Sequence, residues 1–135
     1  AEVAANQDPE FAQSFVENVA QPFLEQATNG EVSLNVTAYP EVIRAEFPLS
    51  TYGADQNSVR DSGLNGINPT SLAEELVYKI DLNPSFSWDS FDLDNDGNVD
   101  RFLILHPAKP QEDGQGGTSS IWSHNWNRNW WWYLY

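Results

Sequence analysis

The chain has 135 residues, a length that suits one domain or part of one and that can bury a core. Its 20 acidic and 6 basic residues give a formal net charge of −14, which disfavours nucleic acid and anionic membranes as partners and favours cations. There is no Cys, so disulfides and thiolate chemistry are excluded, and no apolar run approaches the ~20 residues that span a bilayer. Because the sequence has neither Met nor a signal-peptide pattern, we expect a processed or excised piece whose export signal has been removed.

A first helix is predicted to begin at Asp8-Pro9-Glu10, where an N-cap, an N1 proline and an acidic first turn follow one another. Pro22 predicts a kink or a division into two short helices, and Asn29-Gly30 predicts the end. The apolar residues at helical spacing are Phe11, Phe15, Val16, Val19, Phe23, Leu24 and Ala27.

Strand patterns come next. Residues 32–37 alternate apolar and polar side chains, which predicts a half-buried strand, and residues 42–47 are a second candidate. Residues 48–69 are rich in Gly, Asn, Ser and Asp and predict a long surface loop, either functional or disordered.

A second helix is predicted from Asn68-Pro69 to Asn83-Pro84. Its apolar stripe consists of Leu72, Ala73, Leu76, Val77 and Ile80. Residues 102–105 form a short apolar run that predicts a buried strand, residues 111–120 predict a Gly-rich loop, and residues 121–124 predict one more strand.

The segment from Asp92 to Asp100 has the pattern D-x-D-x-D-G-x-x-D. Calcium takes 6–8 oxygen ligands, and carboxylates at alternate positions can curl around one ion where a glycine allows a sharp turn. The pattern therefore predicts a Ca²⁺ site, with Asp100 bound directly or through water and Asn98 offering its backbone carbonyl. The predicted ligands are Asp92, Asp94, Asp96, Asn98 and Asp100.

Several alternatives compete with this site. Magnesium demands a tighter octahedron, zinc prefers nitrogen and sulfur ligands, and Asp is common in turns that bind nothing. The loop is not predicted to be an EF-hand, because its twelfth position is Leu103 instead of a bidentate Glu. A single loop that leads into a strand-like run favours a structural ion over a sensor.

The stretch Trp88–His106, together with Ile121-Trp122-Ser123-His124, resembles the immune inhibitor A family of secreted bacterial zinc metallopeptidases. A looser similarity extends the resemblance to about residues 11–126. It implies an α/β fold, a mixed sheet with flanking helices, as part of a zincin-like catalytic domain whose calcium loop enters a central strand. It also implies a secreted protein, expected to be a monomer, with a protein or peptide substrate.

The chemistry of that family lies in an H-E-x-x-H helix, where two His bind Zn²⁺ and the Glu activates water. This sequence has only His106 and His124, so no zinc ligand can be carried over and Zn²⁺ is expected only in the full-length parent. Either His could be a hydrogen-bonded structural residue or could share a metal with an acid. We expect residues 1–135 to be a single N-terminal part of the catalytic domain, inactive alone through truncation or degeneration.

Five of the six Trp residues lie between Trp122 and Tyr135, and the status of the Trp-rich tail, residues 127–135, is open. The tail could be a core element, a membrane-interface patch or a sugar-stacking platform. The alternative function is therefore a calcium-stabilised extracellular module, without enzymatic activity, that binds carbohydrate through this end.

Overall fold

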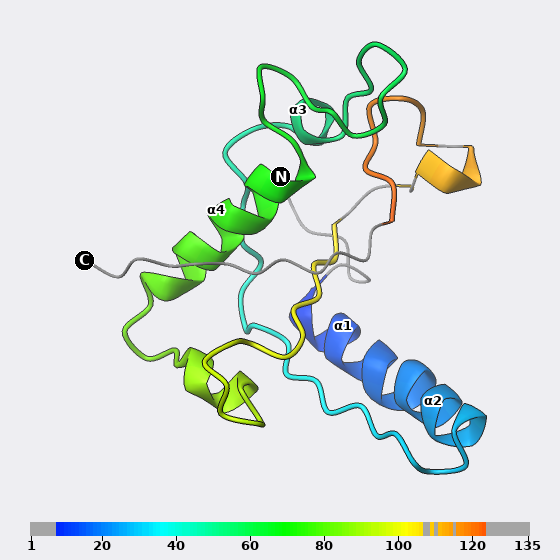
Figure 1. Ribbon diagram of the computed structural model, residues 1–135, viewed down its shortest axis with the longest axis vertical. Helices are drawn as coiled ribbons and strands as arrows, with labels where there is room; N and C mark the ends of the chain where they lie inside the picture. The colour runs from blue at the N-terminus through cyan, green and yellow to red at the C-terminus, as the bar shows by residue number, and fades with distance from the viewer. Residues whose placement is uncertain (1–7, 107–108, 110, 115, 124–135) are drawn as a thin grey trace. The chain divides into compact units, whose positions relative to one another are not determined.

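The computed structural model describes residues 8–106, 109, 111–114 and 116–123, and within these residues it is helix and irregular chain (Figure 1). Its elements are α1 (Pro9–Phe15), η1 (Val16–Ala20), α2 (Gln21–Ala27), α3 (Leu49–Tyr52), α4 (Pro69–Asp81), η2 (Trp88–Phe91) and η3 (Gln111–Asp113). No sheet occurs among the described residues. The β-structure there consists of two isolated bridges, Gln56 with Val59 and Leu64 with Ile67.

The predicted α/β fold with a mixed sheet is therefore wrong. Residues 32–37, 42–47, 102–105 and the described part of 121–124 have no strand assignment. An alternating or apolar pattern favours an extended chain, but a strand forms only when a second strand pairs with its N–H and C=O groups. In place of a ladder, Gln13 of α1 accepts a hydrogen bond from Ala38 N–H at 2.6 Å and donates one to the Val36 carbonyl at 2.7 Å.

The run at residues 102–105 also differs from its prediction as a buried central strand. Leu103 is 65% exposed and Leu105 is 63% exposed, and Phe102 is 44% exposed. An apolar run indicates that a segment is buried in the folded protein, but it carries no information about which residues bury it. The Asp92–Asp100 segment therefore leads into a largely exposed chain and not into a central strand.

The first helix begins where the sequence predicts it. The Asp8 side chain accepts a hydrogen bond from Phe11 N–H at 2.6 Å, as an N-cap should. The structure then has two short α-helices, α1 and α2, joined by the π-helical segment η1, which ends two residues before Pro22. Proline lacks the N–H that would bond to the fourth residue before it, and a π-turn is one way in which a helix accommodates such a break.

The second predicted helix is confirmed as α4. The Asn68 side chain accepts hydrogen bonds from Thr70 N–H at 3.0 Å and Ser71 N–H at 3.2 Å, which satisfies two free donors of the first turn. Leu72 and Ile80 of the predicted stripe are buried. The helix ends at Asp81, shortly before Asn83-Pro84.

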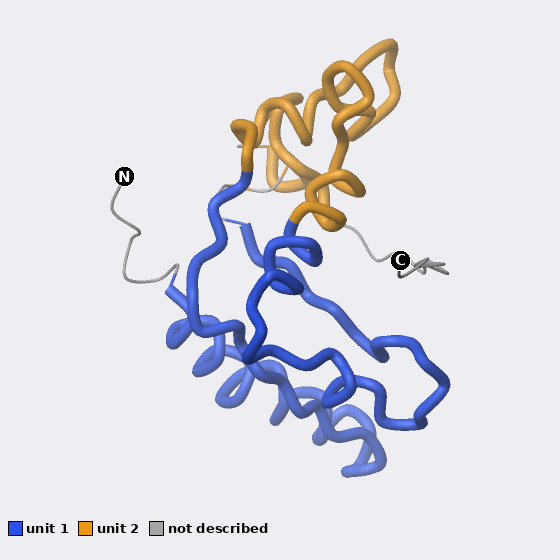
Figure 2. Tube along the Cα trace, turned by 90° about the vertical axis from the view of Figure 1, so that its left-hand side faces the viewer, with its two compact units in different colours: residues 1–45, 76–107 blue, residues 46–75, 108–135 orange. Residues whose placement is uncertain are grey.

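The described residues fall into two compact units, which are described separately (Figure 2). Unit 1 consists of residues 1–45 and 76–107, and unit 2 consists of residues 46–75 and 108–135. Unit 1 contains α1, η1, α2, η2 and the Asp-rich loop. Unit 2 contains α3, η3 and the segment predicted as a long surface loop.

That surface-loop prediction is wrong for much of residues 48–69. Tyr52 is 1% exposed, and its hydroxyl donates a hydrogen bond to Glu75 at 2.6 Å. Both isolated bridges close tight turns through residues with positive φ, Asn57-Ser58 in one and Asn65-Gly66 in the other. Such turns suit Asn and Gly, so the composition typical of a surface loop also suits this compact structure.

A buried carboxylate fixes the Ile121–Ser123 segment within unit 2. Asp61 is 6% exposed, and its two carboxylate oxygens lie 3.3 and 3.2 Å from the Trp122 backbone nitrogen, which donates to them. The Arg60 guanidinium lies 4.0 Å from the centre of the Trp122 ring. Asp55 accepts hydrogen bonds from Asp61 N–H at 2.9 Å and from the Gln111 side chain at 2.7 Å. Side chains therefore hold this segment, together with one backbone hydrogen bond from Gln111 N–H to the Ile121 carbonyl at 3.4 Å, without a strand assignment for residues 121–123.

Candidate metal site

Aromatic side chains of unit 1 surround both ends of the Asp-rich loop. Phe86 contacts Trp88 edge-on, with ring centres 4.8 Å apart, and stacks on Phe91 at 5.7 Å. On the far side of the loop, Phe102 meets Trp88 edge-on at 6.0 Å. The Trp88 indole N–H also donates to Asp81 at the end of α4. These contacts fix the chain on both sides of the loop, so the loop closes over a short distance.

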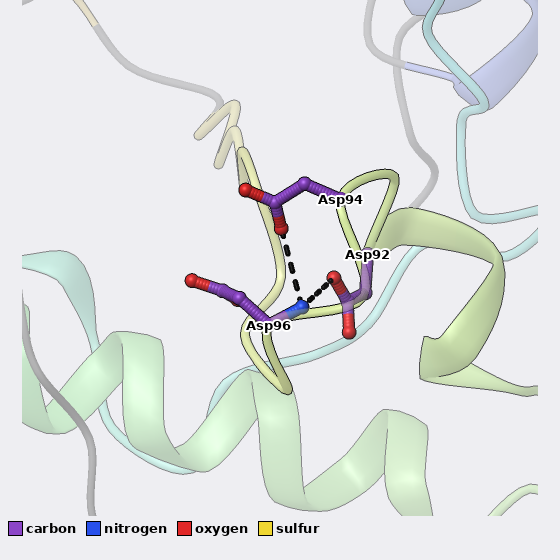
Figure 3. Close-up of side chains that lie close together, drawn as sticks. All are labelled: Asp92, Asp94 and Asp96. Carbon is purple, nitrogen blue, oxygen red and sulfur yellow. Dashed lines mark hydrogen bonds between the residues drawn. The ribbon is translucent and has the colours of Figure 1, made fainter.

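Three of the predicted ligand side chains come together. The ligand oxygens of Asp92, Asp94 and Asp96 all lie within 4.8 Å of one another. Figure 3 shows the Asp92 and Asp94 carboxylates converging on the backbone nitrogen of Asp96, which donates to them at 3.0 and 3.2 Å. The second oxygen of Asp92 accepts from Gly97 N–H at 2.9 Å. Alternate positions along the loop therefore place their oxygens around one small volume.

The turn itself depends on two residues with left-handed backbone. Asn95 has a φ of 58° and Gly97 a φ of 85°. Asn and Gly are the residues that adopt this conformation at least cost, so the sequence permits the reversal that brings the carboxylates together. The sequence pattern predicts the sharp turn at its glycine, which is Gly97, and does not indicate the contribution of Asn95.

The two remaining predicted ligands, Asn98 and Asp100, lie outside the group of three carboxylates. The Asn98 backbone and side-chain N–H groups both donate to Asp96 Oδ1, at 2.8 and 2.9 Å. The Asp100 carboxylate accepts from Leu93 N–H at 2.7 Å, while its own N–H donates to the Phe91 carbonyl at 2.9 Å. Asp100 is absent from the group of three carboxylates and closes the neck of the loop. The D-x-D-x-D-G-x-x-D pattern contains no signal for this closing contact.

Burial and charge at the site are those of an open surface loop. Asp92 is half-buried, whereas Asp94 and Asp96 are exposed. In the described part of the chain, this is the one cluster of three or more His, Cys, Asp or Glu side chains that could hold a metal. All of its donors are carboxylate oxygens, which suit a hard cation and lack the nitrogen and sulfur ligands that zinc prefers.

The zinc chemistry expected from the resemblance therefore has no matching residues in this cluster. His106 lies outside it, and His124 lies outside the described residues. The full sequence contains no H-E-x-x-H. The described residues do not fit a catalytic zinc ion, and no catalytic step is assigned to them. The Trp-rich tail, residues 127–135, also lies outside the described residues.

Comparison with known proteins identifies the class of protein. A model of a peptidase catalytic domain matches residues 7–130, which is most of the chain. The chain is thus related to metallopeptidases, hydrolases that act on proteins. Its family is that of the immune inhibitor A peptidase M6 catalytic domain, and the chain belongs to it, as its resemblance predicted.

The other comparisons return no match. No curated protein and no solved structure matches the chain. Across the described residues, no helix is long and apolar enough to cross a membrane.

Proposed function

We propose that the loop from Asp92 to Asp100 binds a structural Ca²⁺ ion in a secreted, zinc-dependent endopeptidase of the immune inhibitor A type. The observation that carries the proposal is the convergence of three carboxylates within 4.8 Å on one turn. Three negative charges that lie this close repel one another, and a divalent cation between them converts the repulsion into attraction. The proposed ligands are Asp92, Asp94, Asp96, the backbone carbonyl of Asn98 and Asp100.

Calcium is preferred over the competing cations for chemical reasons. An all-oxygen donor set on an exposed loop suits the 6–8 ligands and variable geometry of Ca²⁺. Mg²⁺ needs a near-ideal octahedron and keeps most of its waters, which an exposed loop does not impose. Extracellular calcium is abundant, so a site with modest affinity would be filled in a secreted protein.

The proposed role of the ion is structural. The loop joins Phe91 to Phe102, and both rings belong to the aromatic group around Trp88. An ion that fixes the loop would therefore also fix the distance between these two anchors. The hydrogen bonds of Asp100 to Leu93 and Phe91 already join the two ends of the loop, so the loop would lose little further conformational entropy when an ion binds.

The peptidase function is proposed for the parent domain, and this chain would supply its calcium-binding part. In zinc peptidases the metal activates the water that attacks the peptide bond, and this chemistry needs ligands that the sequence lacks. The residues of this chain would support the domain that binds the protein or peptide substrate, and would not perform hydrolysis alone.

Two measurements on the purified chain test the proposal. Calorimetric titration with Ca²⁺ at neutral pH should show one site, and titration with Zn²⁺ should show no comparably tight site. The chain incubated with Zn²⁺ and casein should release no peptides. Zinc-dependent hydrolysis by the chain alone would refute the proposal that this chain binds calcium but does not hydrolyse peptides. The absence of calcium binding would refute the proposed calcium site.

The carbohydrate-binding alternative has no support among the described residues, because it depends on the Trp-rich tail. It remains distinguishable by experiment. Retention of the chain on insoluble glycans, lost in Trp130→Ala or Trp131→Ala, would favour a binding module over a peptidase part.

A further inference from the structure

Unit 1 contains a groove between the helical segment that begins at Pro9 and the extended chain that runs back beside it. The volume of the groove is about 360 Å³, within the range of small-molecule sites. One wall consists of side chains three or four positions apart, which share a helix face: Glu10, Gln13, Ser14 and Glu17. Ala38 and Pro40 form the opposite wall. The groove therefore follows the helix axis over about two turns.

The Gln13 side chain joins the two walls. Its amide nitrogen donates to Glu17 Oε1 at 2.6 Å and to the Val36 carbonyl at 2.7 Å. Its amide oxygen accepts from Ala38 N–H at 2.6 Å. Both amide hydrogens and the amide oxygen are therefore engaged within the chain. These bonds hold the extended chain beside the helix, so the groove is preformed and a ligand would not have to order it.

The groove has a carboxylate toward each end and no cation of its own. Glu10 and Glu17 are both exposed. Within the described part of the chain, Glu10 makes no hydrogen bond or ion pair, and Glu17 bonds to Gln13 through one oxygen. None of the lining residues is basic, and the first basic residue of the sequence is Arg44. The groove therefore suits a cationic ligand, on a chain whose net charge of −14 attracts cations.

The spacing of the polar groups defines the length of that ligand. At a rise of about 1.5 Å per residue, Glu10 and Glu17 lie about 10 Å apart along the helix, with Ser14 between them. A linear chain of about nine bonds, each about 1.5 Å long, spans roughly 11 Å when it zigzags. Spermidine has a chain of this length, with an ammonium at each end and a further amine between them. Its ends can therefore reach both carboxylates, and its inner amine can donate to the Ser14 hydroxyl.

We propose that this groove binds a linear polyamine, with one terminal ammonium at Glu10 and the other at Glu17. The methylene groups of the ligand pack on Ala38 and Pro40, as the stem of a lysine packs on apolar surface. A peptide with two lysines fits less well, because its backbone amides need partners and the Gln13 amide is already engaged. The groove shares no residue with the Asp-rich loop, so the proposal is independent of the proposed calcium site.

Isothermal titration of the purified chain with spermidine tests the site, at about 0.15 M salt to screen weak contacts with scattered surface charges. One spermidine should bind per chain. Glu10→Gln/Glu17→Gln should weaken binding at least fivefold, because both terminal ammonium groups lose a charged partner. The control Glu31→Gln/Glu41→Gln removes the same charge from exposed side chains outside the groove and should change the affinity less than twofold. Circular dichroism should show unchanged helix content in both variants, because the replaced side chains are exposed.

Ligand length provides a second readout. The terminal diamines of octane and butane carry the same charge, and only the longer diamine can reach both carboxylates. Diaminooctane should bind at least fivefold more tightly than diaminobutane. That preference should disappear in Glu10→Gln/Glu17→Gln, whereas a preference due only to the larger apolar surface of the ligand would persist.

Each of five results would overturn the proposal. Three are the absence of spermidine binding, equal weakening by the groove variant and the control, and a length preference that the groove variant retains. A fourth is loss of spermidine binding in Asp94→Asn/Asp96→Asn, which would place the polyamine at the Asp-rich loop. The fifth is tighter binding of a Lys-Gly-Gly-Lys peptide than of spermidine, lost in the groove variant, which would assign the groove to a protein partner.

Discussion

Removing the charge of Asp94 is the cleanest perturbation of the proposed calcium site. Within the loop, the Asp94 carboxylate accepts a hydrogen bond from Asp96 N–H at 3.2 Å, and that N–H also donates to Asp92 at 3.0 Å. Asp96 is a poorer target, because its Oδ1 accepts both N–H groups of Asn98. Asp94→Asn keeps the size of the side chain and one oxygen while removing a charge from the cluster, so the ion-free loop should keep its shape.

The size of the effect follows from charge and mass action. Two unit charges 4 Å apart in bulk water interact by about 1 kcal/mol, so each carboxylate pair of the cluster gives up a modest repulsion when the ion binds. Calcium at a hundredfold excess over its dissociation constant should stabilise the fold by about 2.7 kcal/mol. For a chain of 135 residues, this corresponds to a rise in Tm of about 10 °C. Asp94→Asn should lower calcium affinity enough to remove most of that rise, and Asp94→Ala or Asp96→Ala should abolish it.

Differential scanning calorimetry with calcium and with a chelator measures this effect directly. The unmodified chain and the control Asp89→Asn, an exposed acid in η2, should both show the calcium-dependent rise in Tm. Without calcium, Asp94→Asn and the unmodified chain should melt within about 2 °C of each other, since exposed substitutions usually cost less than 0.5 kcal/mol. An undiminished rise in Asp94→Asn, or its loss in Asp89→Asn, would refute the assignment of the site.

Two further predictions concern unit 2. Tyr52→Phe should cost about 1–3 kcal/mol in urea unfolding at pH 7, because it leaves the Glu75 carboxylate without the phenolic donor. Burial, and then the hydrogen bond to Glu75, raise the pKa of Tyr52 above its ordinary value of 10.0. The contribution of this pKa shift to the free energy of unfolding is therefore complete below pH 10.0 and is lost as pH rises through the folded-state pKa. Tyr52→Phe should remove that loss of stability at alkaline pH. Gly63→Ala should cost about 3 kcal/mol in the same assay, because its φ is +71° and the new Cβ would lie 1.7 Å from the Ile67 carbonyl oxygen. Gly66→Ala, with a φ of +80° and open space around it, should cost only about 1 kcal/mol, and equal losses in the two variants would contradict the packing argument.

The helices could be predicted because their signals are local. Asp8 and Asn68 cap the residues that follow them within one turn, and Pro22 interrupts a ladder whose bonds span four residues. The strands failed because a strand depends on a partner that can lie anywhere in the chain. The Gln13 side chain, which bonds to Val36 and Ala38, is a contact over 23 and 25 positions that no periodicity could indicate.

In the candidate metal site, too, the sequence predicts some contacts and not others. Asp92, Asp94 and Asp96 are brought together by a turn of the intervening backbone, so their spacing was sufficient to predict their convergence. Asp100 was grouped with them by the same spacing, yet its carboxylate meets Leu93 N–H at the neck of the loop. A ligand pattern specifies which residue types lie in a loop, and the hydrogen-bond donors of the backbone then decide which carboxylates turn inward.

The wrongly predicted sheet and the exposed Phe side chains of α1 and α2 have one physical cause. An apolar pattern indicates that a surface is buried in the folded protein, and it does not identify the residues that bury it. Among the described residues, the buried hydrophobic side chains are Val16, Tyr52, Ala54, Leu72, Ile80 and Ile121. Those exposed include Phe11, Phe15 and Phe23 and reach 81% at Leu93. Exposed apolar surface on this scale is typical of a protein interface, and a local apolar pattern is the same whether the surface is buried within the chain or at an interface.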